Sequence, residues 1–355
     1  MNLDDLSQMK SLDPQNMLAE IDNLPKQLAQ AWELGQNPPL PPTQHAIRNI
    51  IISGLGGSAI GADLLAGYAA SQCPVTVTVH RDYGLPAFAK GPETLFIASS
   101  HSGNTEETLD AFAHALAAGC NMMTVCTGGK LAEKAAAAGV PCWQFPHKGQ
   151  PRAAVGFSFG LLLAAFSRLG LLPPQAALVA EAVAAMKAQQ ETLRAETPAA
   201  TNPAKRYAGQ LVGRWVTVFG SGPLTTVARR WKGQINELAK APANFEFLPE
   251  ADHNCLAGII NPADLLAAKT LTLFLRAPSD HPRNALRAEI TRQTFMLEGL
   301  NTDFYLARGN SPLAHIWTAL HFGDYMAYYL ALAYQIDPTP VDALTTLKAA
   351  LAAQK

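Results

Sequence analysis

The stretch Ile50-Ile51-Ile52-Ser53-Gly54-Leu55-Gly56-Gly57-Ser58-Ala59 passes from three β-branched residues into a glycine-rich turn. The β-branched residues favour a strand, the glycines permit a tight turn, and Ser58 can cap a following helix. A strand that runs through such a turn into a helix is the opening unit of an open, parallel α/β sheet. A second unit of this kind follows at Trp215-Val216-Thr217-Val218-Phe219-Gly220-Ser221-Gly222. The repetition predicts two α/β units of similar architecture.

Further short apolar runs alternate with helix-length segments in both halves of the chain. Most of these runs are apolar on both faces, which is typical of strands in a buried, doubly wound parallel sheet. The fold class is therefore predicted as α/β, with two α-β-α sandwich domains, parallel sheets and added helices at both termini. After Ile50–Ile52, the predicted strands are Val75–Val79, Thr94–Ile97, Met122–Val125 and Val140–Trp143, then Trp215–Phe219, Phe245–Leu248, Thr270–Leu275 and Asp303–Leu306.

Proline-rich stretches and a change of composition divide the chain further. Residues 1–40 carry helical periodicity and are predicted to form an N-terminal helical segment, which ends in a proline-rich stretch. Residues 41–150 are predicted to form the first α/β domain. Residues 151–200 are rich in Ala and Leu and are expected to be a helical connection, broken at Pro173-Pro174. Residues 201–355 are predicted to form the second α/β domain with a C-terminal helix.

The composition limits the class of protein. Of the 355 residues, 48% are hydrophobic and 15% are charged, which is typical of a globular protein with a large core. The formal net charge of −1, without a dense Lys/Arg stripe, argues against nucleic acid as a partner. The five cysteines are scattered, so neither a disulfide framework nor a zinc site is predicted. The start Met-Asn-Leu-Asp-Asp does not resemble a signal peptide, and no apolar run reaches the roughly 20 residues of a membrane span. We expect a cytoplasmic protein without a membrane partner.

The glycine turn at residues 54–59 leaves two interpretations open. Gly54, Gly56 and Ala59 fit the G-x-G-x-x-A fingerprint of dinucleotide binding. Asp82, beyond the second predicted strand, lies roughly where an acid would bind the ribose. An NAD-dependent dehydrogenase is therefore one hypothesis. The other is that the turn only permits close backbone approach at the start of a helix.

A second loop points to a phosphate. Residues Ser99-Ser100-His101-Ser102-Gly103-Asn104-Thr105, here named the serine loop, follow a predicted strand and precede a predicted helix. The loop holds four hydroxyls in seven residues, more than one helix cap uses. Free backbone N–H groups and the dipole at a helix N-terminus favour an anion, and hydroxyls add donors without adding charge. Ser100, Ser102 and Thr105 are therefore predicted to converge on one phosphate.

Three motifs together resemble the bifunctional phosphoglucose/phosphomannose isomerases of the sugar isomerase (SIS) superfamily. They are Gly54-Leu55-Gly56-Gly57-Ser58, Ser100-His101-Ser102-Gly103-Asn104-Thr105-Glu106-Glu107-Thr108 and Asn236-Glu237-Leu238-Ala239-Lys240. The likeness runs nearly end to end, from Asp13-Pro14-Gln15-Asn16-Met17 to Asp337-Pro338-Thr339-Pro340-Val341. It implies two SIS domains and a homodimer whose active site is shared between subunits. It also implies interconversion of glucose 6-phosphate, and of mannose 6-phosphate, with fructose 6-phosphate.

The resemblance also assigns roles to individual residues. It implies that Gly56, Gly57 and Ser58 line the site and that Ser100, Ser102 and Thr105 hold the phosphate. It implies that Glu237 is the base and that Arg152 lies near the reacting carbons. It further implies that His253 opens the sugar ring from the partner subunit and that Lys348 is a site lysine.

Three residues depart from the family pattern. His101 stands where an aromatic residue such as Tyr is expected. Leu238 occupies a position where a polar residue is expected, and Cys255 occupies one where an acid is expected. None of these departures removes a chemical group that the reaction needs.

Aldose–ketose isomerisation needs a base, ring opening and stabilisation of an enediolate. We expect neither a cofactor nor a metal, because no metal-binding motif is present and His315 and His321, six residues apart, cannot share a helix face. Glu237 falls on an amphipathic stretch, and its alternative role is a surface pair with Lys240. A non-catalytic module that senses a sugar phosphate would need neither Glu237 nor His253 and is a further alternative.

Overall fold

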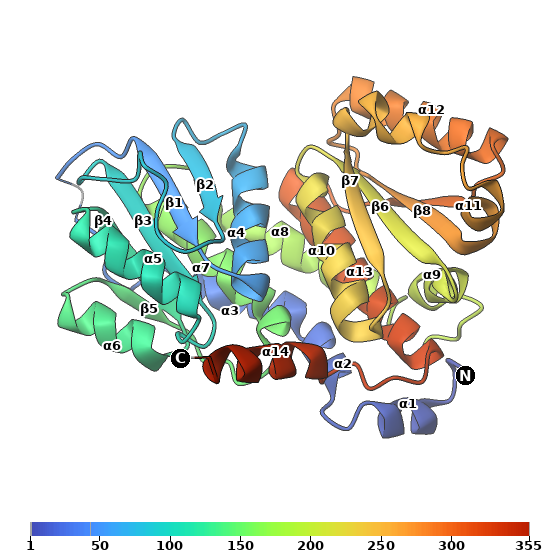
Figure 1. Cartoon of the computed structure of the whole chain (residues 1–355), viewed down its shortest axis with the longest axis horizontal. Helices are drawn as coiled ribbons and strands as arrows, with labels where there is room; N and C mark the ends of the chain where they lie inside the picture. The colour runs from blue at the N-terminus through green and yellow to red at the C-terminus, as the bar shows by residue number, and fades with distance from the viewer. Residues whose placement is uncertain (1, 43, 355) are drawn as a thin grey trace.

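The computed structural model describes residues 2–42 and 44–354 and contains two parallel sheets (Figure 1). All nine predicted strands are confirmed, and so is the α/β fold class. The first sheet has the order β2-β1-β3-β4-β5, and the second has the order β7-β6-β8-β9. The strands are β1 (Asn49–Ser53), β2 (Thr76–His80), β3 (Thr94–Ser100), β4 (Asn121–Cys126), β5 (Cys142–Gln144), β6 (Trp215–Ser221), β7 (Ala243–Leu248), β8 (Thr270–Arg276) and β9 (Thr302–Leu306).

The helices precede, connect and follow these strands. The N-terminal ones are α1 (Leu6–Leu12), α2 (Met17–Asp22) and α3 (Leu24–Leu34). Those of the first half are α4 (Gly56–Ala69), α5 (Glu106–Ala117) and α6 (Gly129–Ala137), followed by the 3₁₀ turn η1 (Pro151–Ala154), α7 (Val155–Arg168), α8 (Ala176–Gln190) and α9 (Pro203–Leu211). The rest are α10 (Leu224–Ala239), the 3₁₀ turns η2 (Glu250–His253) and η3 (Cys255–Ala257), α11 (Ala263–Lys269), α12 (Pro282–Leu297), α13 (Pro312–Ala333) and α14 (Asp342–Ala352).

Alternation along the strands divides the hydrophobic core into layers. Ile50 and Ile52 of β1 face a large inner core together with α4 and α7, whereas Ile51 faces the outer helices α5 and α6. In the second sheet, Leu273 faces the same inner core and Phe274 faces α11 and α12. The inner core is continuous across both halves, so α4, α7, α10 and α13 lie between the sheets (Figure 1).

Close packing between α10 and α13 fixes the helix that carries Glu237. The predicted apolar stripe of α10 is fully buried, and Nε1 of Trp231 donates to the carbonyl of Ala319 at 2.8 Å. A Cβ atom at Gly323 of α13 would lie only 2.1 Å from that Nε1, so a glycine is needed there for the indole to fit. The polar edge of α10 therefore faces the first half of the chain in a fixed orientation.

The two terminal helical regions differ. The N-terminal segment buries Met17, Ile21, Leu24, Leu28 and Trp32. Nε2 of His321 on α13 also hydrogen-bonds to the carbonyl of Ile21 on α2 at 2.9 Å. By contrast, α14 exposes its apolar residues, including Leu344 and Leu347, at the lower edge of the view in Figure 1. None of the helices in the described ranges is both long and apolar enough to span a bilayer.

Candidate active site

The strand order of the first sheet reverses between β1 and β3, so the loops that follow these strands face each other at the carboxyl edge of the sheet. A Cβ atom at Gly54 would lie 2.6 Å from the carbonyl oxygen of Ser99, which shows how closely the two loops approach. The hydroxyl of Ser58 at the start of α4 accepts a hydrogen bond of 3.0 Å from the N–H of His101. The glycine turn and the serine loop therefore form one continuous surface.

Two of the three serine-loop hydroxyls predicted to converge lie together, and the third lies apart. Oγ of Ser100 lies 2.9 Å from Oγ1 of Thr105, whereas Ser102 is exposed and accepts the N–H of Asn104 at 3.2 Å. Thr105 is the N-cap of α5, but no side chain caps the helix. The first-turn N–H groups of α5 thus keep donors available for an anion next to the Ser100–Thr105 pair.

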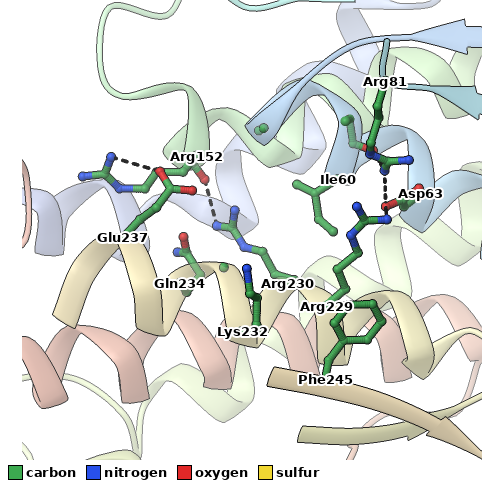
Figure 2. A pocket seen from close by; sticks show the side chains of 14 residues that line it. Ile60, Asp63, Arg81, Arg152, Arg229, Arg230, Lys232, Gln234, Glu237 and Phe245 are labelled. Atoms are coloured by element: carbon green, nitrogen blue, oxygen red, sulfur yellow. Dashed lines mark hydrogen bonds and ion pairs between the residues drawn. The ribbon is translucent and has the colours of Figure 1, made fainter. Parts of the chain in front are cut away.

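A cavity of about 270 Å³ lies between the start of α4, η1 and the polar edge of α10 (Figure 2). Four of the predicted site residues line it. They are Gly56, Gly57, Arg152 and Glu237. A Cβ atom at Gly57 would lie 2.3 Å from the carbonyl oxygen of Pro151, so only a glycine lets η1 approach α4 this closely.

At one end of the cavity Glu237 faces Arg152. Nη1 of Arg152 lies 3.5 Å from Oε2 of Glu237, and the carboxylate is one-third exposed whereas the guanidinium is buried. Nη2 of Arg152 also donates to the carbonyl of Pro338 at 3.0 Å and to that of Thr339. Burial lowers the pKa of Arg152, and the charge of Glu237 partly opposes this shift. The pair therefore joins a fixed cation to an accessible carboxylate.

Lys240 does not pair with Glu237, in contrast to the alternative that the sequence allowed. Its Nζ donates to the carbonyls of Leu238 and Asp337 at 3.1 and 2.8 Å. Burial, helped by the charge of Arg152, lowers the pKa of Lys240 to about 8. Lys240 therefore ties the end of α10 to the segment that also contacts Arg152.

Arg230 is a site residue that the sequence analysis missed. It forms a two-point ion pair with Asp324 of α13, with distances of 3.1 and 2.8 Å, and both side chains are buried. Its Nη2 also donates to the backbone carbonyl of Arg152 at 2.8 Å. Arg230 thus connects η1 to the core of the second half, and this contact positions Arg152 opposite Glu237.

The other end of the cavity is cationic and was also missed. Asp63 of α4 forms ion pairs with Arg81 and with Nη1 of Arg229, the latter at 3.1 Å, whereas Lys232 lines the cavity beside Arg230 (Figure 2). Two cations around one carboxylate, with Lys232 further along the cavity wall, leave an excess of positive charge, which favours an anionic ligand. No local pattern marks Asp63, Arg81 and Arg229, because they meet only through the packing of α4, the end of β2 and α10.

Six of the ten predicted site residues do not line this cavity. Ser58, Ser100, Ser102 and Thr105 belong to the surface formed by the glycine turn and the serine loop, whereas His253 and Lys348 lie apart from both. His253 is exposed on η2, beyond the carboxyl end of β7, whereas Glu237 is near the end of α10, at the opposite edge of the same sheet. Strand β7 has six residues and alone separates these edges by roughly 16 Å at 3.3 Å per residue. Lys348 is exposed on α14. Within one chain, neither His253 nor Lys348 contacts the cavity.

The dinucleotide hypothesis finds no support in the cavity. Its glycine turn is present, but Asp82 is exposed and accepts the N–H of its neighbour Tyr83 at 2.8 Å. The residue from this segment that lines the cavity is Arg81. A ribose hydroxyl placed there would meet a guanidinium already paired with Asp63 instead of a free carboxylate.

Comparison with known proteins gives a consistent result. Residues 200–351 match the family model described as the bacterial phospho-glucose isomerase C-terminal SIS domain. The chain is 41% identical over 339 residues to a bifunctional phosphoglucose/phosphomannose isomerase of Caldicellulosiruptor bescii, which covers 95% of this chain and 99% of that relative. It is 33% identical over 303 residues to the protein of the same name from Aquifex aeolicus, covering 85% and 89% of the two chains.

The fold has relatives among solved structures. The crystal structure of tagatose-6-phosphate ketose/aldose isomerase from Escherichia coli superposes with a TM-score of 0.69, covering 90% of this chain and 93% of that one. The sequence identity is 16%, so this likeness concerns the fold alone.

Proposed function

The chain belongs to the bifunctional phosphoglucose/phosphomannose isomerase family and is an aldose–ketose isomerase, and we propose that it interconverts both glucose 6-phosphate and mannose 6-phosphate with fructose 6-phosphate. Both relatives described above are named for the two activities, and they match 95% and 85% of this chain. We further propose that the reaction is a proton transfer by side chains of this protein, through a cis-enediolate.

The contact between Glu237 and Arg152 carries this proposal. The two side chains lie 3.5 Å apart in a cavity whose wall includes the glycine turn that leads to Ser58. Ser58 in turn contacts the serine loop, where the substrate phosphate would lie against Ser100, Ser102, Thr105 and the start of α5. A phosphate anchor and an accessible carboxylate beside a fixed cation are the elements that sugar-phosphate isomerisation requires.

The chemistry assigned to Glu237 is a proton transfer between neighbouring carbons. Its carboxylate removes the proton from C2 of the open-chain aldose while a proton moves from the oxygen on C2 to that on C1. The resulting enediolate carries negative charge on oxygen, and the guanidinium of Arg152 stabilises it. Glu237 then returns its proton to C1, which gives the ketose. Because Arg230 holds the backbone of Arg152, the cation needs no rearrangement when charge develops.

Ring opening is assigned to His253 of the partner subunit. A histidine on the same chain lies at the opposite edge of the second sheet from Glu237, so a shared active site in a homodimer would reconcile the two roles. We propose that Lys348 likewise acts only in the assembled dimer. Its helix, α14, follows the segment Pro338-Thr339 that contacts Arg152, and the apolar residues of α14 are exposed in the single chain.

Replacement of the base tests the proposal. Glu237→Gln keeps the size and hydrogen-bonding capacity of the side chain but removes the basic carboxylate. We expect at least about a 100-fold loss of kcat with either 6-phosphate, and retained binding of fructose 6-phosphate in a calorimetric titration. Glu298→Gln, an exposed glutamate at the end of α12, is the matched control and should keep wild-type rates. A Glu237→Gln variant with wild-type kcat would overturn the assignment.

A further inference from the structure

A chain of three side chains leads from the serine loop to the N-terminal helices. Nε2 of His101 lies 2.8 Å from Nδ1 of His147, and Nε2 of His147 lies 3.2 Å from Oε2 of Glu20. His101 belongs to the serine loop, His147 follows β5, and Glu20 is on α2. We name these three residues the imidazole chain. It accounts for His101, the member of the serine loop that the family pattern does not explain.

Hydrogen-bond chemistry determines the direction of the contact at the Glu20 end of this chain. The carboxylate of Glu20 can only accept, and the hydrogen bond from His147 holds the pKa of Glu20 below its usual value. Nε2 of His147 therefore donates to Glu20. Between Nδ1 of His147 and Nε2 of His101 one nitrogen donates and the other accepts, according to the tautomer of the two rings. Burial, with a contribution from His147, lowers the pKa of His101 to about 4, so its ring is neutral at physiological pH.

Packing holds the two rings in place. The His101 ring contacts Phe145 and His147 edge-on, with centroid separations of 5.8 and 5.0 Å. The side chain of His147 is only 7% exposed and lies against Phe157, which stacks on Phe145 at 5.0 Å. A ring so enclosed cannot turn without breaking these contacts. The side-chain direction of His101 is therefore part of the structure of the loop.

The backbone of His101 is fixed at both polar groups. Its N–H donates to Ser58, and its carbonyl accepts from the N–H and the hydroxyl of Thr127 at 2.9 and 2.7 Å. With the backbone and the ring both held, the neighbouring residue Ser100 has little freedom to turn. Its hydroxyl is thereby directed to Thr105, the pair assigned to the phosphate.

The far end of the imidazole chain is anchored in the second half of the molecule. Next to Glu20, Ile21 accepts from His321, and Asp22 accepts from Gln190 at 2.8 Å and from Tyr325. His321 and Tyr325 lie on α13, the helix that also holds Arg230 through Asp324. One helix therefore positions both the cation beside Glu237 and, through α2, the serine loop.

We propose that His101, His147 and Glu20 are positioning residues that set the serine loop for the substrate phosphate without contacting the substrate. This rests on the proposed function, in which the serine loop holds the phosphate. Loss of the chain would let the loop sample other conformations and would weaken binding. The chemistry at Glu237, which lies in the cavity and not in the serine loop, would proceed unchanged once substrate is bound.

A matched pair of substitutions at His147 tests this role. His147→Phe keeps a ring but removes both hydrogen bonds, and we expect KM for glucose 6-phosphate to rise about tenfold with kcat within about twofold of wild type. His147→Gln restores one acceptor and one donor, so KM is expected to return to within about threefold of wild type. A merely structural residue would show neither the split between KM and kcat nor this rescue.

A second position keeps the test decisive if His147→Phe does not fold. Glu20→Ala removes the partly exposed end of the chain and is expected to raise KM in the same direction by about threefold. Glu33→Ala, an exposed glutamate on neighbouring α3, is its control and should leave KM unchanged.

The outcomes separate the two proposals. Wild-type protein that turns over neither 6-phosphate would contradict the proposed function. Active wild-type protein with unchanged KM in His147→Phe, or in Glu20→Ala where His147→Phe is unfolded, would overturn the positioning role alone. A fall in kcat at constant KM would also overturn it, because the chain would then act on the chemical step.

Discussion

The two halves of the molecule repeat one topology but differ at the point where the strand order reverses. This point lies between β1 and β3 in the first sheet and between β6 and β8 in the second. Each glycine turn contains a residue in the left-handed region at the same angle, Gly56 and Gly222, both with φ of 51°. The backbone therefore offers the same kind of crevice twice.

The residues that follow β3 and β8 make the difference. After β3 come the hydroxyls of the serine loop, whereas after β8 comes the carboxylate of Asp280. Asp280 accepts the N–H of Ala277 at 2.8 Å and the hydroxyl of Ser221 at 3.3 Å. The second crevice thus has its own anion, and a phosphate placed there would be repelled. Topology therefore supplies the position of a site, and a few side chains decide whether a phosphate binds there.

Moving the acid into the first crevice should have the largest effect. Asp is a favourable N-cap, so Thr105→Asp should leave α5 and the fold intact. Its charge would face the substrate phosphate, and we expect kcat/KM for either 6-phosphate to fall at least about 100-fold. Thr105→Ser, which keeps the hydroxyl, is the control. Near-wild-type kinetics of Thr105→Asp would show that the phosphate does not lie at this loop.

A matched pair of glycine substitutions separates backbone strain from function. A Cβ atom at Gly56 or at Gly222 would meet no described atom within 4 Å, so Ala at either position is disfavoured by its φ alone. Urea denaturation should show a similar loss of about 1–2 kcal/mol for both variants. Only Gly56→Ala should also lower kcat/KM, because Gly56 lines the cavity. An equal loss of activity in Gly222→Ala would mean that the second crevice takes part in the reaction.

The smallest effect is expected from removing the charge of Asp280. Burial raises the pKa of Asp280 in the folded protein, so its contribution to stability is full at low pH and is lost as the pH rises through that value. The Asp280→Asn variant has no carboxyl group at this position, so it does not lose stability in this way. The difference in unfolding free energy between wild type and Asp280→Asn should therefore move in favour of Asn as the pH is raised from about 4 to 7.

Urea denaturation at several pH values measures this shift, and a difference that is constant or moves towards wild type would contradict it. The kinetics of Asp280→Asn should stay within about twofold of wild type.

The fold could be read from the sequence because its signals are local. Each strand is a short apolar run next to a turn, and the burial of Ile50, Ile51 and Ile52 on two faces is what a parallel sheet requires. The ends of the strands were predicted less accurately. The predicted strand Val140–Trp143 is instead β5 at Cys142–Gln144, because Pro141 has no N–H to donate to a neighbouring strand.

The site was predicted only in part because much of it depends on long-range contacts. Ser100 and Thr105 could be named from the composition of the serine loop, and Glu237 and Arg152 from the family resemblance. The contacts that join each pair are seen only in the structure. The Asp324–Arg230 pair joins residues 94 positions apart on two helices, and nothing in either helix marks it. The imidazole chain spans 127 positions between Glu20 and His147 and has no local pattern either.

The most direct test is a coupled assay of the purified protein with glucose 6-phosphate and mannose 6-phosphate, each with and without a chelator. We expect formation of fructose 6-phosphate from both substrates at rates that the chelator does not change, and loss of both activities in Thr105→Asp. Turnover of neither substrate, or turnover that stops when the chelator is added, would contradict it.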